Sequence, residues 1–375
     1  MTETVNIIGA GIGGLTTALT LMQRGIEVKI YESSAEIKPV GAGIILANNA
    51  MQVFQKLGIQ SKIERAGNRI SCMKITDAQL RHISIVDLTE YEKKYGVHNI
   101  AIHRGELQKI LADEIGYAHI NLSKRLSKIE KAALFKLTFE DHTTLVSKLV
   151  IGADGIKSVV RNQLFEKSVL RNANQICWRG VCNIDLPEKY HHELNEAWGK
   201  GKRFGFVKIS DQKVYWYALA NSKNVKAETV DLAEMFKEFH GDVLDIISAT
   251  DKAQIITADI IDLKPIDIWQ NENVCLIGDA AHATTPNLGQ GACQAIEDAY
   301  VLGKLIDQGI AIDDTFKAYE NLRRKKAHAI VNTSWSLGKL AQIENGFGIM
   351  LRNFVMKNIP KSANKRQMDK IFNLN

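Results

Sequence analysis

Apolar and polar residues near the start of the chain follow two kinds of pattern. Residues 5–8 and 28–31 are short, mostly apolar runs of the kind that form central strands of a parallel sheet. Between these runs, apolar side chains recur at the spacing of one helix face, at Leu15, Ala18, Leu19 and Met22. Gly25 ends the helical pattern. The alternation predicts a strand–helix–strand unit over residues 5–31.

Glycines occupy the predicted turn between the first strand and the helix, as G-x-G-x-x-G on Gly9, Gly11 and Gly14. In such a turn the glycines permit a tight bend, a close approach to pyrophosphate, and close packing of helix on strand. The helix N-terminus offers free N–H groups to phosphates. Glu32 ends the second strand, where a carboxylate accepts hydrogen bonds from ribose hydroxyls and disfavours a 2′-phosphate. The unit predicts a dinucleotide site without separating FAD from NAD.

Two later segments repeat the step from an apolar strand into a glycine turn. One ends in Gly152-Ala153-Asp154-Gly155, and the other ends in Gly278-Asp279. The second continues through Pro286, Gly289 and Gly291 into an apolar helix pattern. Taken alone, each aspartate is also explained as a carboxylate that caps its own loop. No second G-x-G-x-x-G follows a strand and no C-x-x-x-x-C pair occurs, which argues against disulfide reductases with two dinucleotide domains.

In this order and spacing, the three glycine segments resemble the signature motifs of the class A (single-component) flavoprotein monooxygenases. That family includes para-hydroxybenzoate, salicylate and 3-hydroxybenzoate hydroxylases, FAD-dependent urate hydroxylase and zeaxanthin epoxidase. Smaller matches at residues 37–43 and 103–107 support the resemblance. It implies an α/β fold with a Rossmann-like FAD-binding domain of the para-hydroxybenzoate hydroxylase type, an inserted, mostly antiparallel β-sheet substrate domain, and C-terminal helices.

We expect the FAD-binding domain to be discontinuous, over residues 1–71, 97–170 and 266–345. The substrate domain then takes residues 72–96 and 171–265, and residues 346–375 form a C-terminal helical segment. Within the inserted part, two runs rich in aromatic and β-branched residues flank a short polar turn at Ser210-Asp211-Gln212. This pattern predicts a β-hairpin.

The resemblance also implies which residues contact FAD. They are Gly9, Gly11, Gly14, Glu32, Gly43, Arg104, Asp154, Asp279, Pro286, Gly289 and Gly291. The helix entered through Gly289 and Gly291 would stabilise negative charge on the N1/O2 edge of the reduced flavin. The family pattern places Asp154 and Arg161 near the cofactor, where they would help to dock NAD(P)H. A surface ion pair is the alternative for Arg161.

Candidate substrate contacts come from the inserted sheet. Arg203 and Tyr215 fall where urate hydroxylase has its substrate-contacting arginine and tyrosine, and strand alternation places Tyr217 on the same face as Tyr215. The alternative makes Arg203 a surface charge and the tyrosines packing residues, and Arg179 is a third candidate. We expect His282 to be structural. No catalytic side chain is identified, and the histidines show no metal-binding spacing.

The resemblance implies a monooxygenase that uses FAD, O2 and NADH or NADPH. It would hydroxylate or epoxidise a small aromatic, heteroaromatic or polyene substrate through a flavin C4a-hydroperoxide. One alternative is an FAD-dependent reductase of isoprenoid double bonds on the same fold. Another is a catalytically idle FAD-bearing interaction module, because the basic stretch 350–357 would suit a membrane surface or a partner helix. Packing of this stretch on the FAD domain explains it more simply.

Composition narrows this picture only slightly. The net charge of +6 over 375 residues suits anionic nucleotides but is too diffuse for nucleic acid. No stretch approaches the roughly 20 apolar residues of a membrane span, and the N-terminus has no leader pattern. The cysteines form no redox or zinc pair, so we expect reduced thiols and a cytoplasmic protein; they are Cys72, Cys177, Cys182, Cys275 and Cys293. Substrate identity, nicotinamide preference and oligomeric state stay open.

Overall fold

The computed structural model describes residues 4–37, 42–165, 167–223, 225 and 230–374. A six-stranded sheet forms the centre of the nucleotide-binding part, in the order β18-β19-β12-β1-β2-β8. These strands are Gln270–Asn271, Val274–Leu276, Leu149–Gly152, Val5–Ile8, Val28–Tyr31 and Ile120–Asn121. All neighbours are parallel except β18 and β19. The strand–helix–strand prediction for residues 5–31 is therefore confirmed.

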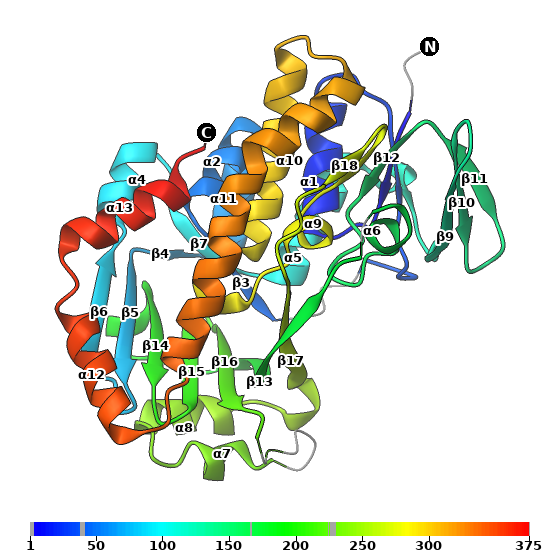
Figure 1. Ribbon diagram of the computed structural model, residues 1–375. Helices are drawn as coiled ribbons and strands as arrows, with labels where there is room; N and C mark the ends of the chain where they lie inside the picture. Colours follow the sequence, from blue (N-terminus) through cyan, green and yellow to red (C-terminus); the bar gives the residue numbers. More distant parts are fainter. Residues whose placement is uncertain (1–3, 38–41, 166, 224, 226–229, 375) are drawn as a thin grey trace.

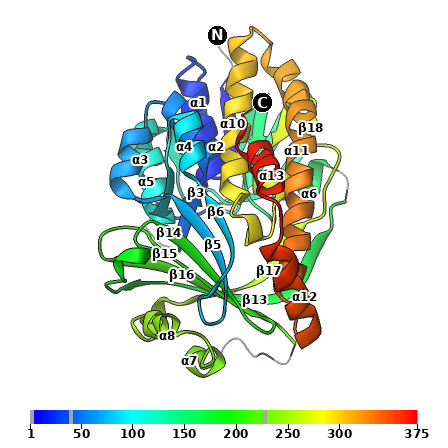
Figure 2. The same cartoon turned by 90° about the vertical axis from the view of Figure 1, so that its left-hand side faces the viewer.

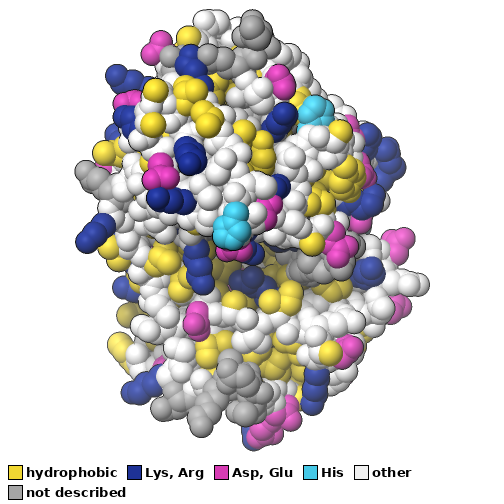
Figure 3. All heavy atoms as spheres, turned by 90° about the vertical axis from the view of Figure 1, so that its right-hand side faces the viewer, with side chains coloured by type: hydrophobic (Ala, Val, Ile, Leu, Met, Phe, Trp, Pro, Cys, Tyr) yellow, Lys and Arg dark blue, Asp and Glu magenta, His cyan; other side chains and the backbone are white. Residues whose placement is uncertain are grey.

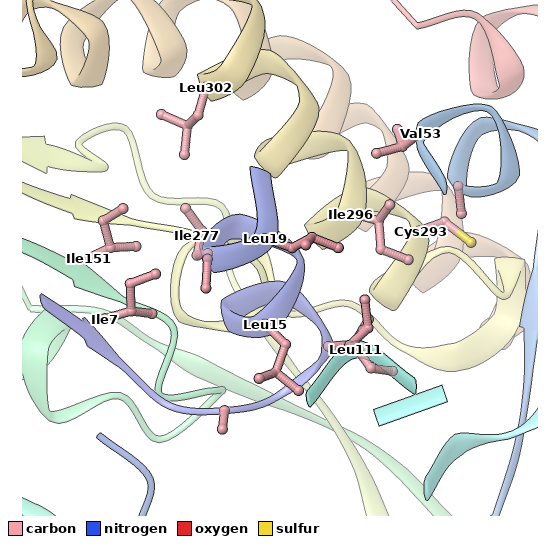
Figure 4. Close-up of a cluster of buried hydrophobic side chains, with 14 of the residues drawn as sticks. Ile7, Leu15, Leu19, Val53, Leu111, Ile151, Ile277, Cys293, Ile296 and Leu302 are labelled. Carbon is pink, nitrogen blue, oxygen red and sulfur yellow. The ribbon is translucent and has the colours of Figure 1, made fainter. Parts of the chain in front are cut away.

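Helices cover this sheet because its strands are apolar on both faces. Helix α1 (Ile12–Met22) lies between the sheet and α10 (Gly291–Asp307), and the long α11 (Ile312–Ala341) packs outside α10 (Figure 1). Leu15 and Leu19 of α1 meet Ile7 and Ile296 in a buried cluster (Figure 4). Each fully buried side chain of this size contributes about 1.5–3 kcal/mol, so the cluster holds the glycine turn of β1 in place.

Smaller elements complete the nucleotide-binding part. Strands β3 (Gly43–Leu46), β7 (Asn99–His103) and β4 (Asn68–Ile70) form an antiparallel sheet. A second three-stranded sheet contains β9, β10 and β11, at Leu126–Lys131, Phe135–Phe139 and Thr144–Ser147. The remaining helices are α2 (Asn48–Lys56), α3 (Gln60–Ala66), α4 (Thr89–Tyr95), α5 (Arg104–Ile115), α6 (Val159–Leu164) and α9 (Asp279–His282).

The inserted part forms a seven-stranded sheet at the other end of the molecule, in the order β17-β13-β16-β15-β14-β5-β6 (Figure 1). Its strands are Ile256–Leu263, Leu170–Asn183, Lys213–Asn221, Lys202–Lys208, Glu193–Trp198, Cys72–Asp77 and His82–Asp87. Only β14 and β5 pair in parallel, as expected of a mostly antiparallel sheet. The fold prediction, including the hairpin of β15 and β16, is confirmed.

The two faces of the seven-stranded sheet have different partners. Phe204 and Trp216 stack on one face, with ring centroids 5.4 Å apart, and pack against Phe236 beneath the short helices α7 (Leu232–Met235) and α8 (Gly241–Ser248). Because side chains alternate along a strand, the neighbouring residues Arg203, Tyr215 and Tyr217 lie on the opposite face. That face meets the nucleotide-binding part.

The C-terminal segment is helical as predicted, with α12 at Gly346–Lys357 and α13 at Lys361–Phe372. The basic stretch does not pack on the FAD domain alone, as expected: α12 lies along β6 of the substrate sheet (Figure 2), while its Arg352 contacts the end of α11 in the FAD domain. Helix α13 instead packs near α2, where Phe372 contacts Tyr91 of α4. In the described part of the chain, no helix has the length and apolar character needed to cross a membrane.

Candidate active site

The glycine turn after β1 needs its glycines for three different reasons. Gly9 has φ +106°, and a Cβ built on it would lie 2.4 Å from the Ala153 carbonyl oxygen. A Cβ on Gly14 would lie 2.1 Å from the Gly9 carbonyl oxygen, so α1 packs closely against the turn only because Gly14 lacks a side chain. Gly11 has nothing within 4 Å of its Cβ position. The open space at Gly11 is where a pyrophosphate would approach the backbone.

Glu32 is anchored beside this turn. Its Oε2 accepts a hydrogen bond from the Ala10 N–H at 2.7 Å, and its Oε1 accepts one from the Ser34 N–H at 2.8 Å. Burial raises the pKa of Glu32, but the hydrogen bonds from Ser34, Ala10 and Ser33 outweigh burial and leave the pKa below its ordinary value. The carboxylate is therefore ionised at neutral pH at the end of β2, where the sequence predicted a ribose contact.

The second glycine segment is held by hydrogen bonds within its own loop and to the third glycine segment. Both carboxylate oxygens of Asp154 accept hydrogen bonds within their own loop: Oδ1 from the Ser158 hydroxyl at 2.5 Å and Oδ2 from the Val159 N–H at 2.7 Å. This is the loop-capping alternative for Asp154. Arg161 is buried rather than part of a surface ion pair, and it donates to the Ala280 carbonyl at 2.9 Å. Arg161 thereby joins the second glycine segment to the third.

Asp279 stands at the start of α9 with its side chain open to solvent. It makes no hydrogen bond to another residue that the structure describes, yet the protein surrounds it closely enough that desolvation raises its pKa, against the charges of His282 and Arg104. Arg104 begins α5, and Gln108 on the same helix donates to the Ala10 carbonyl at 2.7 Å. A carboxylate that has no protein partner among the described residues is suited to accept hydrogen bonds from a polar ligand.

Pro286 and Gly289 lead into the N-terminus of α10. Pro286 opens a short 3-10 helix, and Gly289 follows it with φ +61°. Helix α10 then starts at Gly291 without a side-chain cap and without an acidic residue in its first turn. The helix begins between the two parts of the molecule and runs away from the substrate sheet (Figure 1). Its free N–H groups and positive dipole end are therefore available to a ligand that carries negative charge.

His282 is structural, as expected. Its Nε2 lies 2.7 Å from Oδ2 of Asp298, which also accepts from the Gly278 N–H at 2.9 Å. Arg323 of α11 donates to the other oxygen, Oδ1, at 2.8 Å. Burial raises the pKa of Asp298, but the charges of His282 and Arg323 outweigh it and lower the pKa overall. The buried network fixes the third glycine segment to α10 and α11.

A row of side chains crosses the substrate sheet on the face toward the nucleotide-binding part. Strand register aligns Arg179 of β13 with Tyr217 of β16, Gly205 of β15 and Glu196 of β14. A Cβ on Gly205 would lie 2.1 Å from Cζ of Tyr217, so the glycine lets the tyrosine ring lie across its strand. The Tyr217 hydroxyl consequently reaches Glu196 and donates to Oε2 at 2.6 Å.

Glu196 is the centre of the polar cluster in this row. Besides Tyr217, the Trp198 indole N–H donates to Oε1 at 2.7 Å and the Arg203 guanidinium donates to Oε1 at 3.1 Å. Sequence reasoning did not single out Glu196. Its position two residues before Trp198 on an alternating strand was the available signal.

Arg203 is buried, with a side chain only 2% exposed, so the surface-charge alternative is wrong. In addition to Glu196, it donates to Oδ1 of Asn287 at 2.7 Å and to Oε1 of Gln175 at 3.3 Å. Asn287 directly follows Pro286 in the third glycine segment. Arg203 therefore connects the substrate sheet to the loop before α10, and its charge is neutralised by Glu196.

Tyr215 and Gly43 form the neighbouring contact between the two parts. A Cβ on Gly43 would lie 2.3 Å from Cγ of Tyr215, so the ring packs directly on β3. The Tyr215 and Tyr217 rings lie 5.9 Å apart, and burial raises the pKa of each hydroxyl. Both tyrosines are thus neutral hydrogen-bond donors at neutral pH. Gly43 has a clear packing role here, while its contact with the cofactor stays a prediction.

These elements surround one hollow. Figure 3 shows it between the nucleotide-binding part above and the substrate sheet below, with cationic and hydrophobic side chains along its floor. The residues fit FAD: an open approach at Gly11, a ribose acceptor at Glu32, an unpartnered carboxylate at Asp279, and the uncapped start of α10 at Gly291. The structure brings the predicted cofactor and substrate residues together where the two parts meet, with Tyr215 against Gly43 and Arg203 on Asn287 beside Pro286.

Comparison with known proteins agrees with the geometry. Residues 1–334 match the family described as FAD binding domain. The aurachin C monooxygenase/isomerase of Stigmatella aurantiaca is 34% identical over 360 residues, with 94% of each chain covered. The chain belongs to the class A flavoprotein monooxygenases. It is an FAD-dependent oxidoreductase, which confirms the predicted cofactor and enzyme class.

Two further relatives place the monooxygenase within this family. The 2-heptyl-3-hydroxy-4(1H)-quinolone synthase of Pseudomonas aeruginosa is 30% identical over 378 residues, covering 98% of this chain and 97% of the relative. The solved structure of Klebsiella pneumoniae HpxO with FAD and uric acid has a TM-score of 0.90 and 26% identity, covering 98% and 96% of the two chains. These similarities favour oxygen transfer over the alternatives of a double-bond reductase and an idle FAD-bearing module.

Asp279 gives a test of the cofactor side. We expect Asp279→Asn to raise the melting temperature of the apoprotein at pH 7 while weakening FAD binding about tenfold. Because the folded-state pKa of Asp279 is raised, its stabilising contribution is present below its unfolded value near pH 4 and lost as pH rises through the folded pKa. The gain in melting temperature should therefore vanish near pH 4. Calorimetry across pH and FAD titration measure both effects; an apoprotein destabilised at pH 7 would contradict the assignment.

Proposed function

We propose that this monooxygenase hydroxylates a ring carbon of a neutral, nitrogen-containing fused heteroaromatic compound of the 4-quinolone class, using O2 and NADH or NADPH. The observation that carries the proposal is the ion pair of Arg203 with Glu196. An arginine that bound a substrate carboxylate or a urate anion would need a free guanidinium facing the hollow. Here both terminal nitrogens of the guanidinium are already committed to Glu196, Asn287 and Gln175.

The similarity to the quinolone synthase supports the ring class. That relative and this chain align over nearly their full lengths, which includes the substrate sheet. Two groups in the polar row match the two ends of a 4-quinolone. Glu196 can accept a hydrogen bond from the ring N–H, and Arg179 can donate to the ring carbonyl. In the described part of the chain, no carboxylate forms an ion pair with Arg179.

The chain's own residues then have distinct tasks. FAD, when bound, supplies the activation of O2 with electrons from the nicotinamide. Glu196 orients the substrate by accepting a hydrogen bond from its ring N–H. This hydrogen bond polarises the N–H and makes the ring carbon beside the carbonyl more electron-rich. Arg179 stabilises the negative charge that grows on the carbonyl oxygen. Tyr217 and Trp198 hold Glu196 in place, and the apolar walls around Tyr215 exclude water.

Several finer assignments belong to this proposal. Ten of the eleven predicted cofactor contacts, all except Asp154, are our assignments for the chain. The discontinuous domain boundaries are also our assignment, except that α4, predicted within the substrate domain, packs on α2 of the nucleotide-binding part. Asp154 and Arg161 support FAD indirectly, through the loop that Asp154 caps and the carbonyl of Ala280 that Arg161 contacts. We also propose a cytoplasmic location, where all five cysteines would stay free thiols and reduced nicotinamide is available.

The test is a panel of neutral 4-quinolones, with anionic aromatic acids and urate as the comparison set. We expect the quinolones to stimulate NAD(P)H oxidation, with O2 consumed in equal amount and a product heavier by one oxygen atom. Hydrogen peroxide is measured in parallel to separate hydroxylation from uncoupled oxidation. Arg179→Met should lower turnover of quinolones while retaining FAD. Coupled hydroxylation of the anionic set alone would refute the proposed substrate class.

A further inference from the structure

Helix α12 exposes an apolar stripe that the fold leaves uncovered. Five large side chains on one face are exposed by 72, 62, 51, 65 and 52%, and they are Phe347, Met350, Leu351, Phe354 and Val355. Their spacing of i, i+3, i+4, i+7 and i+8 places them side by side along the helix. We call this surface the α12 stripe.

The opposite face of α12 attaches the helix to the protein. Arg352 is buried there, where it donates to the Ala341 carbonyl at 2.9 Å and lies 5.1 Å from the centre of the Trp198 ring. The helix also starts with a side-chain cap, since Asn345 accepts from the Gly348 N–H. The position of α12 is therefore fixed by its inner face, and the α12 stripe is not needed for packing.

Most of the net charge of the chain lies in the C-terminal segment that carries this stripe. Residues 346–375 contain six basic residues and one acidic residue, a net charge of +5 out of +6 for the whole chain. Five of the cations are exposed, and they are Lys357, Lys361, Lys365, Arg366 and Lys370. Among the described residues of this region, Lys365 pairs with Glu90 of α4, and Asp369 pairs with Lys94. The segment that follows the stripe in the chain is therefore strongly cationic.

We propose that the α12 stripe docks this monooxygenase on an anionic phospholipid bilayer. The helix would lie in the plane of the interface, with Phe347 and Phe354 below the headgroups and the cations of residues 357–370 over anionic headgroups. An anionic bilayer suits both properties of this segment, because it accepts the apolar stripe and attracts the cations that follow it in the chain. The proposal concerns attachment only and is independent of the substrate class.

A second copy of the chain fits the same surface less well. The five side chains offer on the order of 500 Å² of exposed apolar area, below the roughly 800 Å² per partner of a standard interface. Two copies meeting through α12 would also bring two strongly cationic surfaces together, which is unfavourable. A bilayer has neither disadvantage, because its anionic headgroups neutralise the cations.

Flotation of the full-length, FAD-loaded enzyme with lipid vesicles tests the proposal. We expect binding to vesicles that contain phosphatidylglycerol, weaker binding to phosphatidylcholine alone, and a decrease with added salt. Phe347→Ser/Phe354→Ser should reduce binding to the anionic vesicles roughly tenfold or more. Lys357→Gln/Lys361→Gln should reduce binding to anionic vesicles and leave the level on phosphatidylcholine unchanged.

A matched control separates the stripe from general surface hydrophobicity. Val146→Ser removes a side chain that is 61% exposed on β11, away from α12, and should bind vesicles like the unmodified enzyme. Flavin content and melting temperature confirm that every variant is folded. Absence of binding to anionic vesicles would overturn the proposal, as would full binding by the double phenylalanine variant. A stripe-dependent dimer seen by light scattering would replace the bilayer with a second copy.

Discussion

Replacing Gly14 by valine should weaken FAD binding by roughly a hundredfold or more and lower the melting temperature of the apoprotein. A Cβ at position 14 would lie 2.1 Å from the Gly9 carbonyl oxygen, and that atom is backbone. Helix α1 must therefore move off β1, and overpacking of this kind costs about 1–3 kcal/mol or more. The shift also displaces the N–H groups that face the phosphates. Flavin absorbance of the purified protein and calorimetry of the apoprotein measure the two effects.

Gly11→Ala is the matched control for that prediction. Its Cβ meets nothing within 4 Å, so the apoprotein should melt at the same temperature as the unmodified protein. FAD binding should nevertheless weaken, because the methyl group would occupy space that the pyrophosphate needs. Full flavin content in Gly11→Ala would show that the phosphates do not approach this residue. The pair of variants thus separates a packing requirement from a ligand requirement within one motif.

The nucleotide-binding half was predictable because its signals are local. Gly9, Gly14 and Glu32 lie within one strand–helix–strand unit, so their spacing in the sequence fixes their positions relative to each other. The third glycine segment was predictable for the same reason, since a strand, a turn and a helix follow in order. Local patterns of this kind also predicted the hairpin of β15 and β16.

The substrate side could be predicted only in part, because its contacts join distant segments. Arg203 was singled out, but its partners Glu196, Asn287 and Gln175 come from three other places in the chain. Whether an arginine faces solvent, substrate or a carboxylate depends on that pairing, which sequence spacing does not encode. The position of α12 was predicted only in part for a related reason. Its apolar face indicated packing on the FAD domain, whereas the structure leaves that face exposed and attaches the helix through the buried Arg352.

The ion pair at the centre of the substrate side gives the second large expected effect. Arg203→Met should lower the free energy of unfolding by about 3–5 kcal/mol, because it removes one partner of a buried pair and leaves the other uncompensated. Glu196→Gln should destabilise for the same reason. The double variant Arg203→Met/Glu196→Gln should recover most of the stability, since no unpaired charge remains, but turnover should stay low because the group that orients the substrate is gone. Chemical denaturation and steady-state kinetics measure the two quantities.

A second ion pair in the same sheet provides the comparison for this cycle. Arg171 of β13 donates to both oxygens of Asp262 on β17, at 2.8 and 2.6 Å, and the aspartate side chain is fully buried. Arg171→Met should also destabilise the protein, yet it should leave turnover at the level of the unmodified enzyme when both are assayed well below their melting temperatures. If Arg203→Met and Arg171→Met lowered turnover equally, the Arg203–Glu196 pair would be a structural element alone. A loss of turnover confined to the Arg203–Glu196 variants would instead place this pair at the substrate.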